Sequence, residues 1–405
     1  MMFALGVALF ALALAVSVAL HEAGHLWVAR RLGMKVRRFA VGRGPTVFSF
    51  RRGETEYGLG LFPAGGFCEI AGTTALDELA PGEYDRALYR QRTWKRVAVM
   101  SGGVCMNFLL AVVLVLGLAV GWGLPDLHPR IVVESVGCVP PSQGPAPGYG
   151  LVGCDGPGPA ASAGIRPGDV VLAVDGRDVA RFGDLVERVW QSSGVVELVI
   201  DRQGREMRVP VAVEPVQRWV VDPRSGVERS TTVGAIGLSA QPVAGPVRYG
   251  LVAAVPAAFA FTGGLVVASA RTLASAPSKV ASLWHSVTGG ERDADTPVSV
   301  VGAASLGGQA AERGMWESFV LLMVGLNLFV GLVNLLPLLP LDGGHTAVAV
   351  YEACRNRVRR LRGLSDAGPV DFGKLLPVTY AFVVAGGAFT VLTVVADVVA
   401  PIRLA

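Results

Sequence analysis

The first 20 residues of the chain carry no charged side chain, and apolar residues resume at Leu26 after the motif HEAGH at residues 21–25. A run of about 20 apolar residues is long enough for a helix to cross a bilayer. We therefore expect a membrane-spanning helix over residues 1–29. Ionisable side chains inside a membrane are costly, so two histidines and a glutamate in this helix predict a functional site.

The motif has the spacing of a metal site. Residues four apart share one face of a helix, so His21 and His25 can present both imidazoles to one ion. Glu22 follows His21 directly and can act on a water at that ion, which is the arrangement of H-E-x-x-H in zinc proteases. A chance match near a helix end is the alternative, since the motif fixes only three residues.

Composition supports a membrane protein. Of the 405 residues, 52% are hydrophobic and 17% are charged, which predicts an integral membrane protein with some soluble mass. The formal net charge of +4 is too small to indicate nucleic-acid binding. No C-x-x-C pair occurs among the five cysteines, which disfavours a cysteine zinc site. The first helix lacks the basic start of a signal peptide, so we expect it to be retained.

Basic residues gather in two segments, 30–96 and 346–374. The positive-inside rule assigns both to the cytoplasm, so the N-terminus lies outside and the HEAGH motif lies near the cytoplasmic side. Further spans are expected at 97–120, 315–345 and 375–400. The prediction is a multi-pass α-helical protein of the cell membrane with about four transmembrane helices.

The stretch 245–275, within a region 215–314, is harder to assign. Leu251 to Ala270 is uncharged and long enough to span, but Pro256 interrupts it. If it crossed the membrane, the second basic segment would lie outside. We therefore expect an interfacial or re-entrant helix, and a true span is the alternative.

An apolar, glycine-rich segment lies at 54–70 within the first basic region. Pro63 argues against a helix, and residues 57–61 (YGLGL) alternate large residues with glycine, as in a short strand. We expect a membrane-associated β-hairpin with an unpaired edge that binds an extended substrate segment. A plain cytoplasmic hairpin is the alternative. The candidate substrate-binding residues are Gly58, Leu59, Gly60 and Leu61.

Residues 125–214 are polar enough to form a soluble β-rich domain, which by helix parity is extracytoplasmic. Strands are expected at 131–133, 195–200 and 206–213. A Pro/Gly-rich insertion at 137–159 is bracketed by Cys138 and Cys154, which can form a disulfide in an oxidising compartment.

The third span ends in NLLPLLPLDGGH at residues 334–345. Pro337 and Pro340 break the helix, and broken helix at membrane depth is tolerated where it lines a polar cavity. Asp342 lies in this break, on the same side of the membrane as HEAGH. The topology therefore brings Asp342 to the level of the two histidines.

A catalytic zinc ion takes three protein ligands and keeps one position for water. His21, His25 and Asp342 supply this number for Zn²⁺, and Glu22 is the expected general base. The substrate carbonyl would be polarised by the metal.

Three further polar residues lie near these motifs. Asn334 is expected either to support the oxyanion or substrate backbone, or to hydrogen-bond a neighbouring helix. Asn107, in the second span, is expected to join helices. Three ligands are already present without His345, so we expect this residue to have a structural or supporting role.

Together these segments resemble a known family. HEAGH and NLLPLLPLDGGH, separated by PAASAGIRPGDVVLAVDGRDV, which looks like a PDZ domain, are similar to the site-2 protease family of intramembrane zinc metalloproteases, of the regulator-of-sigma-E protease type and its actinobacterial counterparts. LGLFPAGGF and RTWKRVAVMSGGVCMNFLLA resemble the family's β-loop and second span. The chain departs from the family pattern at Val104 and Leu339, where proline is usual, and it has room for one PDZ domain.

The resemblance implies hydrolysis of a peptide bond in the transmembrane segment of a single-span membrane protein. The usual target is an anti-sigma factor that has already been cut outside, and the PDZ domain would bind a peptide or substrate tail. A catalytically silent PDZ adaptor and a metal transporter are the rival functions. Glu22 beside the histidines argues against both.

Overall fold

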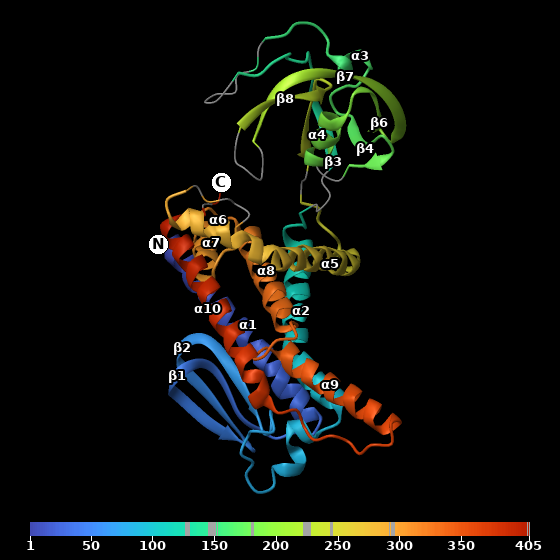
Figure 1. Cartoon of the computed structure of the whole chain (residues 1–405). Coiled ribbons are helices and arrows are strands. Elements are labelled where there is room, and N and C mark those ends of the chain that lie inside the picture. Colours follow the sequence, from blue (N-terminus) through green and yellow to red (C-terminus); the bar gives the residue numbers. More distant parts are fainter. Residues whose placement is uncertain are drawn as a thin grey trace. The chain divides into compact units, whose positions relative to one another are not determined.

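The computed structural model describes residues 1–125, 130–144, 151, 153–179, 182–221, 228–243, 246–290, 292, 296–402 and 404. The chain divides into two compact units. Unit 1 consists of Met1–Gly123 and Arg248–Ala405, and unit 2 consists of Leu124–Val247. Unit 1 contains the long helices and one small sheet, whereas unit 2 is built mainly on a larger sheet (Figure 1).

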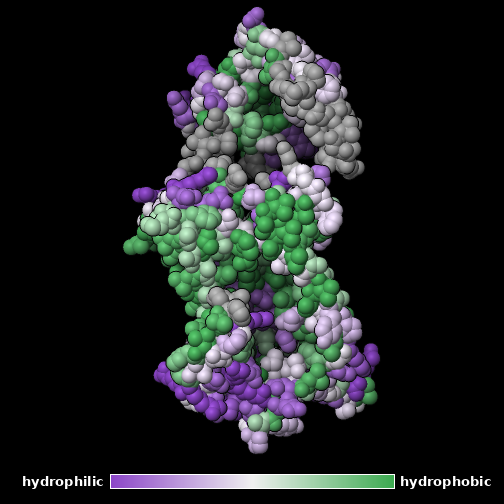
Figure 2. All heavy atoms as spheres, turned by 90° about the vertical axis from the view of Figure 1, so that its left-hand side faces the viewer, coloured by the Kyte–Doolittle hydropathy of each residue, from purple (hydrophilic) through white to green (hydrophobic). Residues whose placement is uncertain are grey.

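Unit 1 is a membrane unit. In the described part of the chain, five helical segments are long and apolar enough to cross a bilayer. Figure 2 shows hydrophobic side chains in a broad band over these helices, above a hydrophilic end. The expected polytopic helical membrane protein with a β-rich insert is confirmed. The five segments are Met2–Arg31, Thr93–Gly121, Leu251–Val287, Trp316–Asn334 and Phe372–Val399.

The helices of unit 1 follow the order of these segments, with shorter helices between them. The first helix, α1, packs against α2 and α7, and α2 packs against α5, α8 and α9. Their bounds are α1 Met2–Arg31, α2 Thr93–Gly121, α5 Leu251–Ser275, α6 Val280–Val287, α7 Val300–Glu312, α8 Trp316–Asn334, α9 Asp342–Leu361 and α10 Leu376–Val399.

Helix α5 occupies the stretch that was hardest to assign. Its length and composition suit a span when it is taken together with α6. Figure 1 shows α5 lying across α2 and α8 rather than along them. An interfacial or re-entrant position therefore stays a prediction, supported by this arrangement.

Helix α9 differs from the sequence expectation. The segment 346–374 was expected to be a basic loop, but the chain is helical from Asp342 to Leu361. No proline interrupts this stretch, and Arg359 and Arg360 lie in the last turn, where cations complement the helix dipole. Arg96 on α2 forms a buried ion pair with Glu352 on α9, which joins the two helices.

The small sheet of unit 1 is formed by β1 (Val36–Arg52) and β2 (Thr55–Ile70), which pair antiparallel. Gly42 and Gly44 both have positive φ, which only glycine adopts easily. The strand bends there, so the second half of β1 returns along the other side of β2.

This bend makes one expectation wrong. Gly58 pairs with Ala40 on one side and with Ser49 on the other, and Leu59 likewise pairs with Val41 and Phe48. Leu61 follows them on the same strand. The unpaired edge predicted for this stretch is therefore absent at Gly58 and Leu59, and Gly60 pairs with Thr46 and lies against the backbone of Gly42 and Arg43. The described pairs do not include Leu61. The edges of the described sheet are 46–52 and 66–70.

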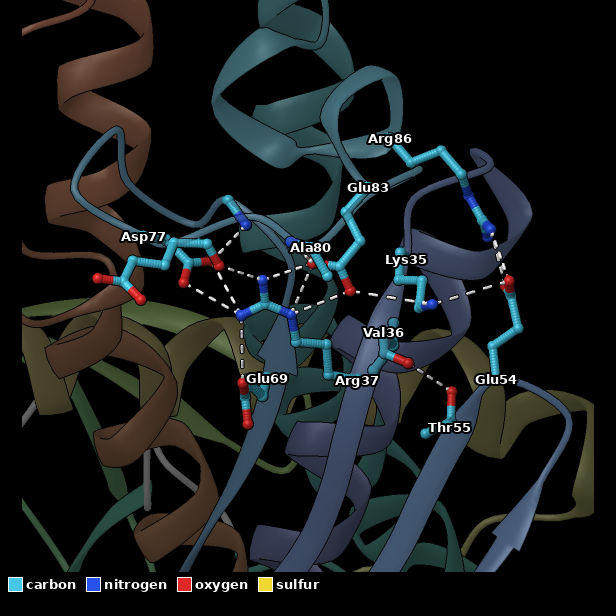
Figure 3. A network of polar contacts seen from close by, with 12 residues as sticks. Lys35, Val36, Arg37, Glu54, Thr55, Glu69, Asp77, Ala80, Glu83 and Arg86 are labelled. Atoms are coloured by element: carbon cyan, nitrogen blue, oxygen red, sulfur yellow. Dashed lines mark hydrogen bonds and ion pairs between the residues drawn. The ribbon is translucent and has the colours of Figure 1, made fainter.

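A network of ion pairs ties this sheet to the segment that follows it (Figure 3). The Arg37 guanidinium lies at its centre, 2.6 Å from the Glu83 carboxylate, 3.1 Å from Asp77 and 3.4 Å from Glu69. Glu83 is buried, and its hydrogen bonds from Arg37 hold the pKa of its carboxyl group below the ordinary value.

This network predicts an acid-sensitive contact. A lowered pKa in the folded state stabilises the fold above the unfolded value, about 4.3 for glutamate, and this stabilisation is lost as pH falls through the folded pKa. Lowering the pH below about 4 should therefore decrease the melting temperature of the detergent-solubilised protein. Arg37→Gln should weaken this pH dependence, whereas Arg38→Gln, at a more exposed pair, should not. An identical pH dependence in Arg37→Gln and wild type would contradict the assignment.

Unit 2 is a seven-stranded sheet in the order β8-β7-β6-β4-β3-β9, with β5 beside β4. The helices are α3 (Pro159–Ser162) and α4 (Phe182–Gln191). Its core includes Ile131, Leu198 and Ile200. The strands are β3 Arg130–Val136, β4 Val170–Val174, β5 Arg177–Asp178, β6 Gly194–Arg202, β7 Arg205–Val221, β8 Glu228–Ala235 and β9 Leu238–Val243.

The unit extends beyond the expected boundary at residue 214. The last strand, β9, pairs with the first, β3, so the sheet is complete only after residue 243. A disulfide joins Cys138 to Cys154, with the two Cα atoms 5.8 Å apart. Both cysteines lie in the predicted insertion, and Cys68, Cys105 and Cys354 are free.

Candidate metal centre

Three side chains from the two ends of the chain meet in unit 1. The Nε2 atoms of His21 and His25 are 3.2 Å apart, and Asp342 Oδ2 lies 3.3 Å from each. A tetrahedral zinc ion with bonds of about 2.0–2.1 Å separates its ligand atoms by about 3.3 Å. The triangle therefore has the dimensions of three zinc ligands.

The protonation of His25 is set by the backbone. Its Nδ1 lies 2.8 Å from the carbonyl oxygen of Val99, which can only accept, so Nδ1 donates and Nε2 is the ring nitrogen left for a metal ion. Asp342 Oδ2 and His21 Nδ1 are buried with no hydrogen-bond partner among the described residues. In the neutral ring, the Nε2 lone pair faces the Asp342 carboxylate oxygen at 3.3 Å, and a cation between the two atoms makes this arrangement favourable. The donor set fits a zinc ion.

Close helix packing places the histidines. A Cβ atom on Gly24 would overlap the backbone of Gly102, so α1 and α2 touch at this point. A Cβ atom on Gly103 would overlap the rings of both His21 and His25. The two glycines of α2 therefore admit α1 and leave the space that the imidazoles occupy.

Asp342 is placed by the break between α8 and α9. It is the first residue of α9. A Cβ atom on Gly343 would overlap the carbonyls of Leu335 and Leu336, and one on Gly344 would overlap Leu338. These two glycines let the start of α9 pack directly on the end of α8, which directs the carboxylate toward α1.

Glu22 lies between the metal cluster and the small sheet. A Cβ atom on Gly66 would be 3.0 Å from Glu22 Cγ and 3.1 Å from Val18 Cγ1, so the edge 66–70 of β2 runs beside this part of α1. Glu22 is half-buried and is not part of the ligand triangle. The Glu22 carboxylate is therefore not one of the three candidate metal ligands.

A cavity of about 620 Å³ opens beside Asp342. Asn334, the last residue of α8, lines this cavity together with Ser101 and Tyr351. His345 lies outside the ligand triangle, with its ring 5.9 Å from that of Phe372. The cavity therefore reaches the side of the cluster that Asp342 occupies.

Sequence reasoning missed a polar pair that supports α1. The Ser17 hydroxyl donates to Asn327 Oδ1 at 2.5 Å, and the Asn327 amide donates to the Met323 carbonyl at 2.8 Å. Ser17 lies one turn before His21, so this bond fixes α1 against α8. Two polar residues in apolar spans were the available signal. Asn107, which was singled out, is buried, and its amide nitrogen has no partner in the described part of the chain.

The sequence model of the family described as Peptidase family M50 matches residues 9–367. The chain belongs to peptidase family M50. Its relatives include "Zinc metalloprotease Rip1" of Mycobacterium bovis, 52% identical over the whole of both chains, and the protein of that name from Mycolicibacterium smegmatis, 48% identical over the whole of both. "Metalloprotease MmpA" of Caulobacter vibrioides is 26% identical over 86% of each chain.

Family membership settles the class of the protein. The expected resemblance to the site-2 proteases is confirmed. The prediction that the chain is a zinc-dependent protease of the membrane is confirmed as well. Its substrates are accordingly membrane proteins.

The packing of Gly103 yields a prediction about zinc. Gly103→Ala should displace both imidazoles and weaken zinc binding by at least about tenfold, the scale seen when groups that orient metal ligands are changed. Zinc affinity would be measured by competition with a chelator. Gly117→Ala is the matched control, because it lies on the same helix and a Cβ atom there meets nothing within 4 Å. Equal zinc affinity in the two variants would contradict this account of the site.

Proposed function

We propose that His21, His25 and Asp342 hold the catalytic zinc, and that Glu22 is the general base for hydrolysis of a peptide bond within a transmembrane segment. The observation that carries this assignment is the triangle of ligand atoms, 3.2–3.3 Å on each side. Its members come from α1 and α9, at opposite ends of the chain, and they lie beside membrane-spanning helices.

The roles of the side chains follow from their positions. Bound zinc supplies a Lewis acid that polarises a carbonyl and makes water more acidic. Glu22 is placed to take a proton from the attacking water and to return it to the leaving amine. The Val99 carbonyl keeps the His25 ring in its ligand orientation. Asn334, in the cavity beside Asp342, can donate its amide to a substrate carbonyl oxygen.

A transmembrane helix must unwind before it is cut, because its amides are satisfied by its own hydrogen bonds. We propose that the unwound segment pairs with the sheet edge 66–70 of β2. This edge replaces the stretch first expected to bind substrate, and a Cβ atom on its Gly66 would lie 3.0 Å from Glu22 Cγ. Pairing there would hold an extended backbone beside the general base.

Unit 2 is proposed to be a PDZ domain that binds a substrate tail. The segment 159–179, which carries the resemblance, forms α3, the turn before β4, and β4–β5. A helix, α4, packs mainly against β8 and also touches β9, and these are the first and last strands in the sheet order. By family resemblance, the substrate is an anti-sigma factor that has already lost its outer domain.

Orientation in the membrane is proposed from charge. The small sheet and α9, which carry much of the basic charge, lie toward one end of unit 1 in Figure 1, and α5 to α7 lie toward the other. This arrangement supports a cytoplasmic end that includes 30–96 and 346–374, with unit 2 and both termini outside.

The assignment of the active site is tested by two substitutions. Glu22→Gln should keep bound zinc and lower cleavage of a single-span membrane substrate by at least about 10²-fold, the scale of general acid–base catalysis. Asp342→Ala should lose zinc, whereas His345→Ala, close in sequence but outside the triangle, should keep it. Zinc per chain and cleavage would be measured on the same preparations. Unchanged cleavage in Glu22→Gln, or full zinc content in Asp342→Ala, would refute the corresponding role.

The proposed orientation predicts the location of reporters. A compartment-sensitive reporter fused after Arg359 should score cytoplasmic, and one placed at Gly204 in unit 2 should score extracytoplasmic. A reporter after Arg359 that scores outside would make the α5 segment a true span and would reverse this part of the topology.

A further inference from the structure

A second cavity of unit 1, of about 680 Å³, lies between α9 and the start of α10. It is lined by the break after α8, by α9 and by the segment 369–379 that leads into α10. Figure 1 shows the chain turning from the end of α9 back to α10 toward the end of unit 1 that carries the small sheet. Pro337, Ala347 and Tyr351 line both this cavity and the one beside Asp342, so the two cavities share a wall.

The cavity lies where two membrane segments end. The α8 segment ends at Asn334 and the α10 segment begins at Phe372, and the lining residues come from just beyond the first and from the first turns of the second. Lipid headgroups occupy the zone at the ends of membrane spans. The exposed Tyr351 suits this zone, because its ring is apolar and its hydroxyl is polar. The cavity is therefore at the level of the headgroups.

Two cations line this cavity, Arg355 on α9 and Lys374 at the start of the α10 segment. Within the described part of the chain no carboxylate pairs with either of them, whereas Arg360, on the same helix as Arg355, pairs with Asp366 at 3.1 Å. The two cations therefore lie beside an apolar cavity without a protein anion to neutralise them.

The Arg355 side chain is held in place. Its Nη2 donates to the Gly368 carbonyl, and its guanidinium lies over the Tyr351 ring, 5.7 Å from the ring centre. Arg355 is half-buried, and its Nε is buried with no hydrogen-bond partner among the described residues. A cation that has lost water without gaining an anion is destabilising, and a bound anion would offset that cost.

The rest of the lining sets the character of the ligand. Asp371 is the one carboxylate among the described lining residues, and its Oδ1 accepts a hydrogen bond from the Gly373 N–H at 2.9 Å. Two cations and one carboxylate leave the lining net positive. Leu339, Leu375 and Val378 are aliphatic, and Val378 is 60% exposed on the surface of a membrane-spanning helix. The cavity thus combines a positive region with an apolar region that faces lipid.

We propose that this cavity binds an anionic glycerophospholipid. The lipid phosphate pairs with Arg355 and Lys374, and the acyl chains lie along Leu339, Leu375 and Val378. In the proposed orientation, on which this one statement rests, the site is in the cytoplasmic leaflet, whose surface is anionic. The bound lipid also contacts the wall that the cavity shares with the one beside Asp342, and so it supports the start of α9 from the side away from the ligand triangle.

The test is native mass spectrometry of the full-length protein in a neutral detergent, with phosphatidylglycerol as the probe and zwitterionic phosphatidylcholine as the comparison. Wild type should bind phosphatidylglycerol about tenfold or more tightly than phosphatidylcholine, the scale of a charge-assisted hydrogen bond. Arg355→Gln and Lys374→Gln should each weaken phosphatidylglycerol binding by about tenfold. Arg357→Gln is the matched control, because it removes the same charge from an exposed position of α9 outside the cavity, and it should bind as wild type.

Three results would overturn the proposal. Equal affinity of wild type for the two lipids would remove the role of charge. Equal loss in Arg357→Gln and Arg355→Gln would reduce the effect to general attraction by a basic surface. Displacement of the lipid by an equal concentration of glycerol phosphate would make the cavity a site for soluble phosphates.

Two further measurements keep the test decisive. If Arg355→Gln melts at a lower temperature without lipid, Lys374→Gln, at an exposed residue, decides the matter. Zinc content should stay at the wild-type level in every variant, because the ligand triangle contains none of the substituted residues. A negative lipid result with full zinc content would therefore reject the lipid site and leave the proposed active site unaffected.

Discussion

The contact between α1 and α2 at Gly24 and Gly102 is the constraint on which the rest of the site depends. At this point the two helix backbones touch, and no side chain of any size fits between them. One residue further along α2, Gly103 leaves the space that the two imidazoles fill. A histidine pair on a membrane helix is costly, and close packing of this kind is how such a pair is enclosed and oriented toward a third ligand.

The position of Asp342, the proposed third ligand, depends on a second close contact. Broken backbone between α8 and α9 would be unfavourable in lipid, but here it packs within the protein and lines a cavity of mostly apolar residues that Ser101, Asn334 and Asp342 also line. Gly343 and Gly344 allow α9 to begin against the end of α8. The buried pair of Arg96 and Glu352 then holds α9 against α2, the same helix that shapes the histidine site. Both halves of the ligand triangle are therefore positioned by α2.

Much of this site could be predicted from sequence, because its parts follow strong local rules. Residues four apart on a helix share a face, and ionisable residues in an apolar run are rare unless they function. The basic segments gave a topology that brought Asp342 to the level of the histidines. The sequence could not show how α1 and α2 pack against each other around the two histidines. The role of Gly103 depends on which residues of α1 face it, which is a matter of packing between helices.

The errors have physical causes too. The segment Gly58 to Leu61 has the alternation of a strand, but the alternation does not reveal how many neighbours the strand has. The bend at Gly42 and Gly44 supplied the second neighbour. Residues 346–361 were assigned to a loop by charge, whereas arginines are good helix formers and suit a last turn. The boundary at 214 failed because the final strand of unit 2 pairs with its first, and such a long-range pair leaves no local signal.

The most direct test of the zinc centre is X-ray absorption spectroscopy at the zinc edge on the full-length protein carrying one equivalent of zinc. The account predicts a first shell of nitrogen and oxygen atoms at about 2.0–2.1 Å, with outer-shell scattering from two imidazole rings. A sulfur neighbour at about 2.3 Å, or scattering from fewer than two imidazoles, would contradict it.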